Sequence, residues 1–137
     1  MLEIYTDGAC RGNPGPASIS YLFIQDNEII KKHGEYLGNS TNNQAEYKAI
    51  ILALDEAKCY TRNTVKVHSD SELAIRQITK LWKINNPNLS ELCNKVYQCA
   101  QLFKIVEFFH VCRENQYIKI CDKICNDKLN TKCPKKK

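Results

Sequence analysis

This sequence of 137 residues lacks a long apolar run. Its longest unbroken apolar stretches span a few residues, such as Ile50 to Leu54, whereas a helix that crosses a bilayer needs roughly 20. The first residues also lack a basic segment leading into an apolar one, which is the pattern of a secretion signal. These absences predict a cytoplasmic protein that does not span or bind a membrane.

Cys-x-x-Cys pairs are also missing, although the chain has eight cysteines scattered from Cys10 to Cys133. That scatter excludes zinc-ribbon spacing, and we expect Cys59, Cys93 and Cys99 to be small buried apolar residues. Intracellular proteins of hyperthermophiles are the exception in which disulfides persist. For such a source, a Cys59–Cys133 bridge is conceivable.

The chain shows no internal repeat and no linker. Its length fits one domain that buries roughly two thirds of its unfolded surface without needing a partner, so we expect a monomer. The net charge of +5 is moderate, and four lysines lie within the last six residues. We therefore divide the chain into a domain over residues 1–130 and a basic tail over 131–137, which would add affinity for a polyanion.

The period of the hydrophobic pattern changes along the chain. Alternation at 2–6, 17–25 and 28–37, interrupted by turns at 12–16 and 26–27, predicts an antiparallel meander in which Leu2 and Ile4 point inward and Tyr5 outward. Helical spacing begins at the cap-forming residues 40–43 and stops before Tyr60. Further helices are predicted at 71–79, 88–103 and 114–129, and further strands at 64–68 and 105–111.

This element order, β-β-β-α-β-α-α-β-α, predicts an α/β fold with a mixed five-stranded sheet and flanking helices. The strand at 105–111 is almost wholly apolar, which predicts burial on both of its faces.

Three carboxylates stand where an open α/β sheet builds its sites. Asp7 ends the first strand before a glycine, Glu46 lies in the first turn of the first helix, and Asp70 follows the fourth strand. Each has an ordinary structural alternative. Asp7 suits a turn, Glu46 would stabilise the helix dipole, and Asp70 would cap the helix that begins at Ser71.

The segments around these carboxylates favour a shared role. They read YTDGACRGNPGPA at 5–17, TNNQAEYKAI at 41–50 and HSDSELAIRQ at 68–77, and they resemble the signature blocks of type 1 ribonucleases H. The resemblance covers essentially the whole chain and implies the ribonuclease H-like fold. It also implies a fourth carboxylate near the start of the last helix, which RENQYIKICD at 113–122 supplies as Asp122.

Phosphodiester hydrolysis needs an activated water and a stabilised leaving oxygen, and two divalent ions about 4 Å apart provide both. Carboxylates without His or Cys suit Mg²⁺ or Mn²⁺ rather than zinc. Without ions, the gathered acids are expected to have raised, coupled pKa values. The resemblance implies that Asp7 and Asp70 bridge or ligate the ions, Glu46 ligates the ion near the leaving group, and Asp122 holds the one bearing the attacking water.

Family members often carry a mobile His or Arg before the last helix that assists product release. Arg113 occupies that neighbourhood, and His110 is its competitor. We prefer Arg113, because His110 belongs to the apolar alternation of the last predicted strand.

The resemblance also implies a substrate surface for an RNA–DNA hybrid. A 2′-hydroxyl is what marks RNA, and the RNA strand would be lined by Asn13, Asn42, Asn43 and the segments at Gly8 and at Ser71–Glu72. Thr41 would seat a phosphate of the DNA strand, and Trp82 and Lys83 would meet its backbone. Helix capping by Asn42 and Asn43, and a core-edge Trp82 beside a solvated Lys83, are the structural alternatives.

Two departures from the family pattern bear on substrate choice. Glu72 replaces the glutamine of many members, which adds negative charge near an anionic substrate, and Cys121 replaces the more usual alanine before Asp122. The sequence also shows no separate hybrid-binding domain before residue 7 and no lysine-rich insertion beyond Lys80–Asn86. We expect an endonuclease that cuts the RNA strand of hybrids and leaves 5′-phosphate and 3′-hydroxyl ends. The alternatives are a broader nuclease that also cuts RNA–RNA and a catalytically silent hybrid-binding module.

Overall fold

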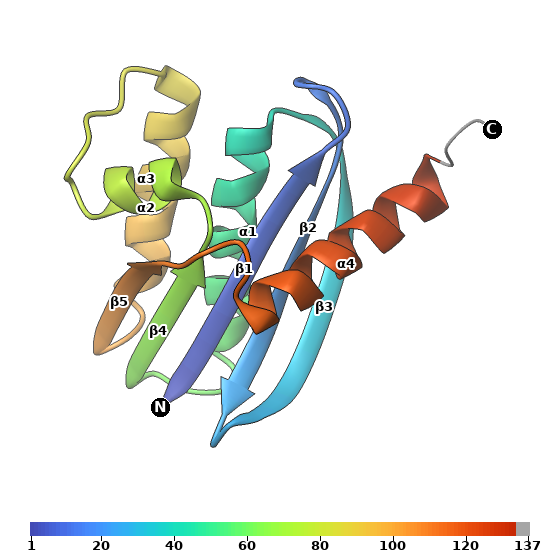
Figure 1. The fold of residues 1–137 in the computed structure, drawn as a ribbon. Helices are drawn as coiled ribbons and strands as arrows, with labels where there is room; N and C mark the ends of the chain where they lie inside the picture. Colours follow the sequence, from blue (N-terminus) through green and yellow to red (C-terminus); the bar gives the residue numbers. More distant parts are fainter. Residues whose placement is uncertain (134–137) are drawn as a thin grey trace.

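The computed structural model describes residues 1–133, which form a five-stranded mixed sheet in the order β3-β2-β1-β4-β5 (Figure 1). Strands β1, β2 and β3 are antiparallel, whereas β4 and β5 run parallel to β1. Within the described range, no helix combines the length and apolarity needed to cross a membrane. The strands are β1 (Leu2–Cys10), β2 (Gly15–Gln25), β3 (Glu28–Ser40), β4 (Thr64–Ser69) and β5 (Ile105–His110), and the helices are α1 (Asn42–Ala57), α2 (Glu72–Ile78), α3 (Pro87–Ala100) and α4 (Gln116–Lys132).

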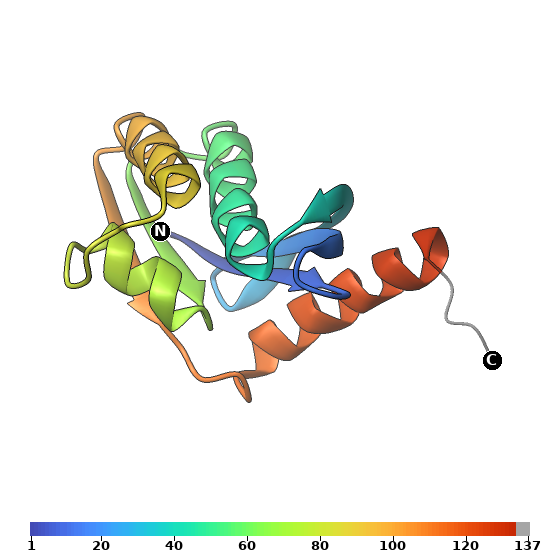
Figure 2. The same cartoon turned by 90° about the horizontal axis from the view of Figure 1, so that it is seen from above.

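Helices cover the sheet on both faces. Helices α1 and α3 lie side by side on one face and α4 lies on the other (Figure 2). The larger core fills the space between the sheet and α1 to α3, and a smaller one lies under α4 around Leu22, Ile118 and Cys121. The predicted fold class and element order are thereby confirmed.

The predicted burial of the last strand is wrong. Strand β5 is the edge of the sheet, and its residues alternate between exposed and half-buried. Val106 and Phe108 pack against the larger core, whereas Ile105 and Phe109 are exposed. Helix α4 packs on β1, β2 and β3, so the outer side of β5 lies beyond its reach. Within the described part of the chain, no helix covers this side of β5, and the apolar content of the strand could not show this.

Tyr5 also differs from its predicted outward orientation. Its side chain is only 8% exposed, because α4 covers this face of β1. The ring stacks on His68 at 4.4 Å and lies 4.8 Å from the ring of Tyr117 at the start of α4. The alternation of β1 therefore separates two cores rather than a core and solvent.

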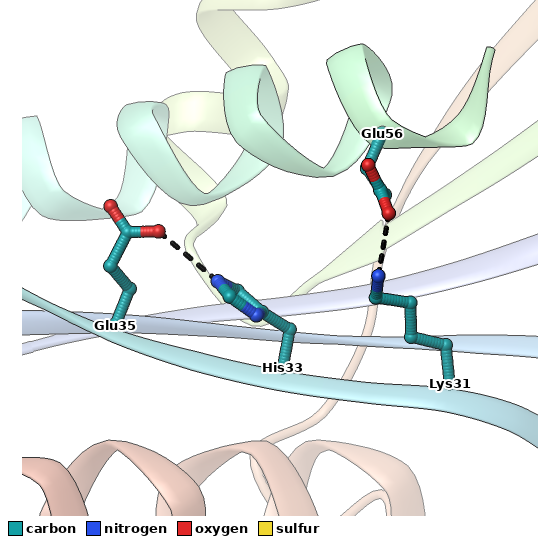
Figure 3. A network of polar contacts seen from close by, with 4 residues as sticks. All are labelled: Lys31, His33, Glu35 and Glu56. Atoms are coloured by element: carbon teal, nitrogen blue, oxygen red, sulfur yellow. Dashed lines mark hydrogen bonds and ion pairs between the residues drawn. The ribbon is translucent and has the colours of Figure 1, made fainter. Parts of the chain in front are cut away.

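Polar contacts lie along β3 on the face opposite α4, and one of them joins β3 to α1. Lys31 Nζ lies 2.5 Å from Glu56 Oε1, and His33 Nε2 lies 3.1 Å from Glu35 Oε1 (Figure 3). Pairs this close to the surface stabilise a fold by roughly 1 kcal/mol or less. The Lys31–Glu56 pair anchors the edge strand β3 to the helix that carries Glu46, whereas the His33–Glu35 pair lies within β3.

The cysteine predictions are confirmed for Cys93, which is buried, and wrong for Cys59, which is exposed at the end of α1. Cys99 is half-buried. The Cys59–Cys133 bridge is not formed, since all eight cysteines are free. Cys133 instead lies beside Tyr36 at the end of α4, on the other face of the sheet from α1.

The end of α4 passes the boundary predicted at residue 130. Arg11 donates hydrogen bonds to the carbonyl of Cys133 at 3.1 Å and to Asn130 Oδ1, so the glycine-rich turn after β1 contacts the last turn of the helix. Residues 134–137 of the predicted tail lie outside the described residues.

Candidate active site

The parallel pairing of β1 and β4 brings two carboxylates together. Thr6 stands opposite Ser69 in the register, so the next residue in each segment, Asp7 and Asp70, lies at the same edge of the sheet. Asp7 is within the strand rather than in a turn, and Ser71 rather than Asp70 caps α2. The structural alternatives for both aspartates are therefore wrong.

Glu46 reaches the same point from α1. Its Oε1 accepts a hydrogen bond of 2.6 Å from the backbone N–H of Gly8. A Cβ on Gly8 would lie 2.6 Å from the carbonyl carbon of Ala45, so only glycine lets β1 approach the helix this closely. Helix α1 begins at Asn42, which places Glu46 just past the first turn rather than in it.

These carboxylates form one buried group. Asp7, Glu46 and Asp70 each offer an oxygen, and these oxygens lie within 4.8 Å of one another. Asp122, on the second turn of α4, joins them around a cavity of about 450 Å³ that Gly8, Asn42 and Arg113 also line. Asp122 is exposed, whereas Asp7 and Glu46 are buried.

The electrostatics of the group match the expectation for gathered acids. Burial is the main cause that raises the pKa of Asp7 from its ordinary 3.8 to about 8, with further increases from the charges of Asp70 and Asp122. Burial, followed by the charges of Asp7 and Asp70, likewise raises the pKa of Glu46 well above its usual range. The site therefore lacks positive charge where its carboxylates meet.

A divalent cation fits this deficit. Asp70 Oδ1 is buried and has no hydrogen-bond partner, a costly state for a carboxylate oxygen unless a ligand satisfies it. The donors are all carboxylate oxygens, as hard cations of the Mg²⁺ class prefer. Asp7, Glu46 and Asp70 would hold such an ion, and Asp122 lies on the same cavity.

Arg113 lies at this cavity and His110 does not line it. Arg113 Nε is 3.8 Å from Asp70 Oδ2, and its side chain is 87% exposed while that of Asp70 is 11% exposed. An exposed arginine at this distance supplies little compensation. Its placement fits the predicted neighbourhood, and His110 is the exposed last residue of β5.

The predicted substrate residues near the start of α1 divide between two adjoining hollows. Asn42 lines the carboxylate cavity, whereas Asn13, Thr41 and Asn43 line a second cavity of about 280 Å³. Thr41 caps α1 by accepting from the N–H of Gln44, so Asn42 and Asn43 are not the capping residues. Asn13 Oδ1 accepts from the N–H of Asn42 at 3.1 Å and thus joins the β1–β2 turn to the helix.

Ser71 and Glu72 begin α2. The Ser71 hydroxyl accepts from the N–H of Ala74 at 3.2 Å, and Glu72 lies 3.5 Å from Arg76. The ion pair offsets part of the charge that Glu72 adds. Neither residue lines the carboxylate cavity.

Trp82 and Lys83 lie apart from the carboxylates, in a hollow of about 520 Å³ between the α2–α3 loop and α3. Trp82 is 45% exposed, which disagrees with the alternative of a core-edge residue. The loop is held by buried Gln77, which accepts from Tyr47 Oη at 2.7 Å and whose Nε2 lies 3.5 Å from the carbonyl of Lys83.

Sequence reasoning missed some residues of these hollows. Asn86 and Asn88, at the start of α3, line the cavity of Asn13 and Thr41, and Lys119 lines the carboxylate cavity. The cap-forming asparagines beside Pro87 were a usable signal for a helix start, but only the tertiary fold places that start beside Thr41.

Comparison with known proteins agrees with this geometry. The RNase H family model matches residues 1–122. Ribonuclease HI of Halobacterium salinarum is 42% identical over 89 residues, which are 64% of this chain and 45% of that protein. The bifunctional protein Rv2228c of Mycobacterium tuberculosis is 32% identical over 130 residues, 93% of this chain and 35% of that protein. The chain thus spans less than half the length of these relatives.

Solved structures resemble the whole described fold. RNase H1 from Halobacterium salinarum superposes with a TM-score of 0.91 at 33% identity, covering 95% of this chain and 98% of the other. LC11-RNase H1, solved in complex with an RNA/DNA hybrid, superposes with a TM-score of 0.86 at 32% identity, covering 93% of this chain and 95% of the other.

Proposed function

Because the chain belongs to the RNase H family, we propose that it is an endonuclease that hydrolyses the RNA strand of RNA–DNA hybrids. The observation that carries the proposal is the meeting of Asp7, Glu46 and Asp70 within 4.8 Å, with Asp122 on the same cavity. The hybrid bound to LC11-RNase H1 supports the choice of substrate. The products would carry 5′-phosphate and 3′-hydroxyl ends.

We further propose that two Mg²⁺ or Mn²⁺ ions bind the four carboxylates. When bound, such ions activate the attacking water and stabilise the leaving oxygen. The chain's own part is to hold the acids in place. The Gly8 N–H fixes Glu46, and the β1–β4 pairing fixes Asp7 against Asp70. Arg113, exposed at the rim, would assist release of the product.

Strand selection would come from the polar groups beside the carboxylates. Asn42 lines the carboxylate cavity and Asn13 and Asn43 line its neighbour, so their amides are available to a 2′-hydroxyl. Thr41, together with Asn86 and Asn88, would seat a phosphate of the DNA strand. Trp82 and Lys83 would contact the same strand farther along the surface, and the protein would act as a cytoplasmic monomer.

Cleavage of matched end-labelled duplexes tests the proposal. Wild type and Asp7→Asn are incubated with RNA–DNA, RNA–RNA and DNA–DNA duplexes in Mg²⁺, in Mn²⁺ and in EDTA. We expect cutting of the RNA strand of the hybrid that is lost in EDTA and falls by at least 10²-fold in the variant, because a metal ligand is removed. Lys123→Ala, an exposed change on the outer side of α4, serves as the matched control.

The RNA–RNA lane measures the breadth of the activity, since Glu72 alters the charge beside the site. Hybrid binding without cutting in either metal would replace the enzyme with a catalytically silent binding module. The four carboxylates argue against that outcome, because a binding surface for a polyanion gains nothing from buried negative charge.

A further inference from the structure

The groove between α1 and α3 holds two lysines that the proposed chemistry does not use. Lys48 on α1 is half-buried and Lys95 on α3 is exposed, and both line two neighbouring hollows of about 220 and 290 Å³. The two helices lie side by side on one face of the sheet (Figure 2). The lysines therefore lie together in one groove formed by these helices.

This groove continues from the cavity of Thr41. The first hollow shares Gln44 and Asn88 with that cavity, and the second shares Lys48 and Lys95 with the first. A connected path thus leads from the proposed phosphate seat along the two helices. Its farther part has an apolar floor made of Leu37, Ile51, Leu52 and Leu92.

The charges in the groove favour an anion. Among residues 1–133, neither Lys48 nor Lys95 has a carboxylate oxygen within 4 Å. Of the two acids on the groove, Glu35 is turned toward His33 (Figure 3), while Glu91 is exposed. Phosphate oxygens are natural partners for ammonium groups that have no carboxylate beside them.

We propose that this groove binds single-stranded DNA that extends from a hybrid held at the carboxylate site, with Lys48 and Lys95 contacting successive phosphates. The proposal rests on the proposed function, because that function places the DNA strand at Thr41. The lining side chains offer two cations and an apolar floor for sugars and bases, which is a chemistry that binds strands without reading sequence. An acidic segment of another protein is the rival occupant.

Hybrid affinity with and without an extension tests the proposal. Fluorescence anisotropy in an Asp7→Asn background, which prevents cutting, compares a blunt hybrid with hybrids whose DNA strand extends at the 3′ or the 5′ end. We expect one of the two extensions to tighten binding by roughly three- to tenfold at low salt, as two added phosphate contacts predict.

Matched variants assign that gain to the groove. Lys48→Ala with Lys95→Ala should abolish the gain, leave the blunt affinity unchanged and lower the salt dependence for the extended hybrid by about 1.4, from about 0.7 per phosphate. Glu91→Gln should increase the gain. Lys104→Ala with Lys128→Ala removes the same charge from exposed positions outside the groove. This control variant should keep the gain in affinity from the extension. Circular dichroism melting shows that each variant is folded.

A gain that survives the loss of Lys48 and Lys95, or no gain from either extension, overturns the proposal. If poly-glutamate displaces the labelled hybrid and neither DNA extension tightens binding, the groove is assigned to an acidic protein segment. Failure of the proposed function looks different, because it would appear either as a blunt hybrid that does not bind or as a hybrid that wild type binds without cutting in Mg²⁺ or Mn²⁺.

Discussion

At the scale of single residues, Asp7 has an unusual environment for a carboxylate. It is buried beside other acids, and burial and charge raise its pKa from 3.8 to about 8. A raised carboxyl pKa means that the folded chain holds the proton more tightly than the unfolded chain does. The resulting stabilisation is complete below about pH 4 and is lost as the pH rises through about 8.

We therefore expect the metal-free protein to become less stable between about pH 4 and pH 8. Thermal melts in EDTA across this range should show a falling Tm in wild type, with a flatter profile in Asp7→Asn. At pH 8 the free energy of unfolding of the variant should exceed that of the wild type by an amount on the order of a few kcal/mol, because an amide carries no charge to bury. A parallel pH dependence in both proteins would contradict the assignment.

Gly8 provides a second test at this scale. In Gly8→Ala the new Cβ would meet the backbone of Ala45 and Glu46, which cannot move without shifting α1. We expect a loss of about 1–3 kcal/mol, the usual cost of overpacking, and weaker Mg²⁺ binding because Glu46 is displaced. Urea unfolding and calorimetric titration measure the two effects, and Ala9→Ser, at the half-buried next position, is the control.

At the scale of elements, the helices and strands were predictable from periodicity and turn residues, but their surroundings were not. The strand at 105–111 was placed correctly along the chain, yet its apolar residues gave no sign that it forms an edge. Tyr5 was assigned to solvent because the sequence of β1 does not show that α4 returns across it. The error at Tyr5 concerns a contact between segments more than 100 residues apart. The error at 105–111 concerns the position of that strand at the edge of the sheet, away from α4.

The same limit applies to the site. Asp7, Glu46 and Asp70 were recognisable from their positions at element ends and from family-like motifs. Asp122 required the resemblance, since nothing in the local pattern of α4 distinguishes it from Asp127. Asn86, Asn88 and Lys119 were missed because only the fold brings them to the cavities they line.

The packing of α4 on β3 gives a prediction for a whole element. A Cβ on Gly34 would overlap Ile124 Cγ2, so the helix rests directly on the strand. Gly34→Ala should destabilise the protein by about 1–3 kcal/mol. Because the obstacle is a side chain, Ile124→Ala should cost less in the Gly34→Ala background than in wild type. A double-mutant cycle in urea measures this coupling, and strictly additive effects would show that the contact is absent.

At the scale of the whole molecule, the site joins segments that are far apart in the chain. The carboxylates at positions 7, 46, 70 and 122 come from β1, α1, the end of β4 and α4. They approach one another only in the folded state, so an ion that binds them should stabilise the fold.

We expect Mg²⁺ or Mn²⁺ to raise the Tm of wild type, because an ion at 100 times its Kd adds about 2.7 kcal/mol to the free energy of unfolding. EDTA should reverse the increase, and the Asp70→Asn variant should show much less of it because the unpaired Oδ1 loses its charge. Na⁺ at matched ionic strength separates this effect from general screening. An equal rise in Na⁺ would contradict specific binding.

The position of α4 has a consequence for motion. Among the described helices, α4 alone packs on its face of the sheet and carries Asp122, while the other three carboxylates belong to the opposite layer or to the strands between. If α4 detaches as a unit, one ligand leaves while three remain. Bound ions would then hold α4 on the sheet. Hydrogen exchange of the α4 amides should slow when Mg²⁺ is added, at lower Mg²⁺ concentrations than are needed to slow exchange in α1.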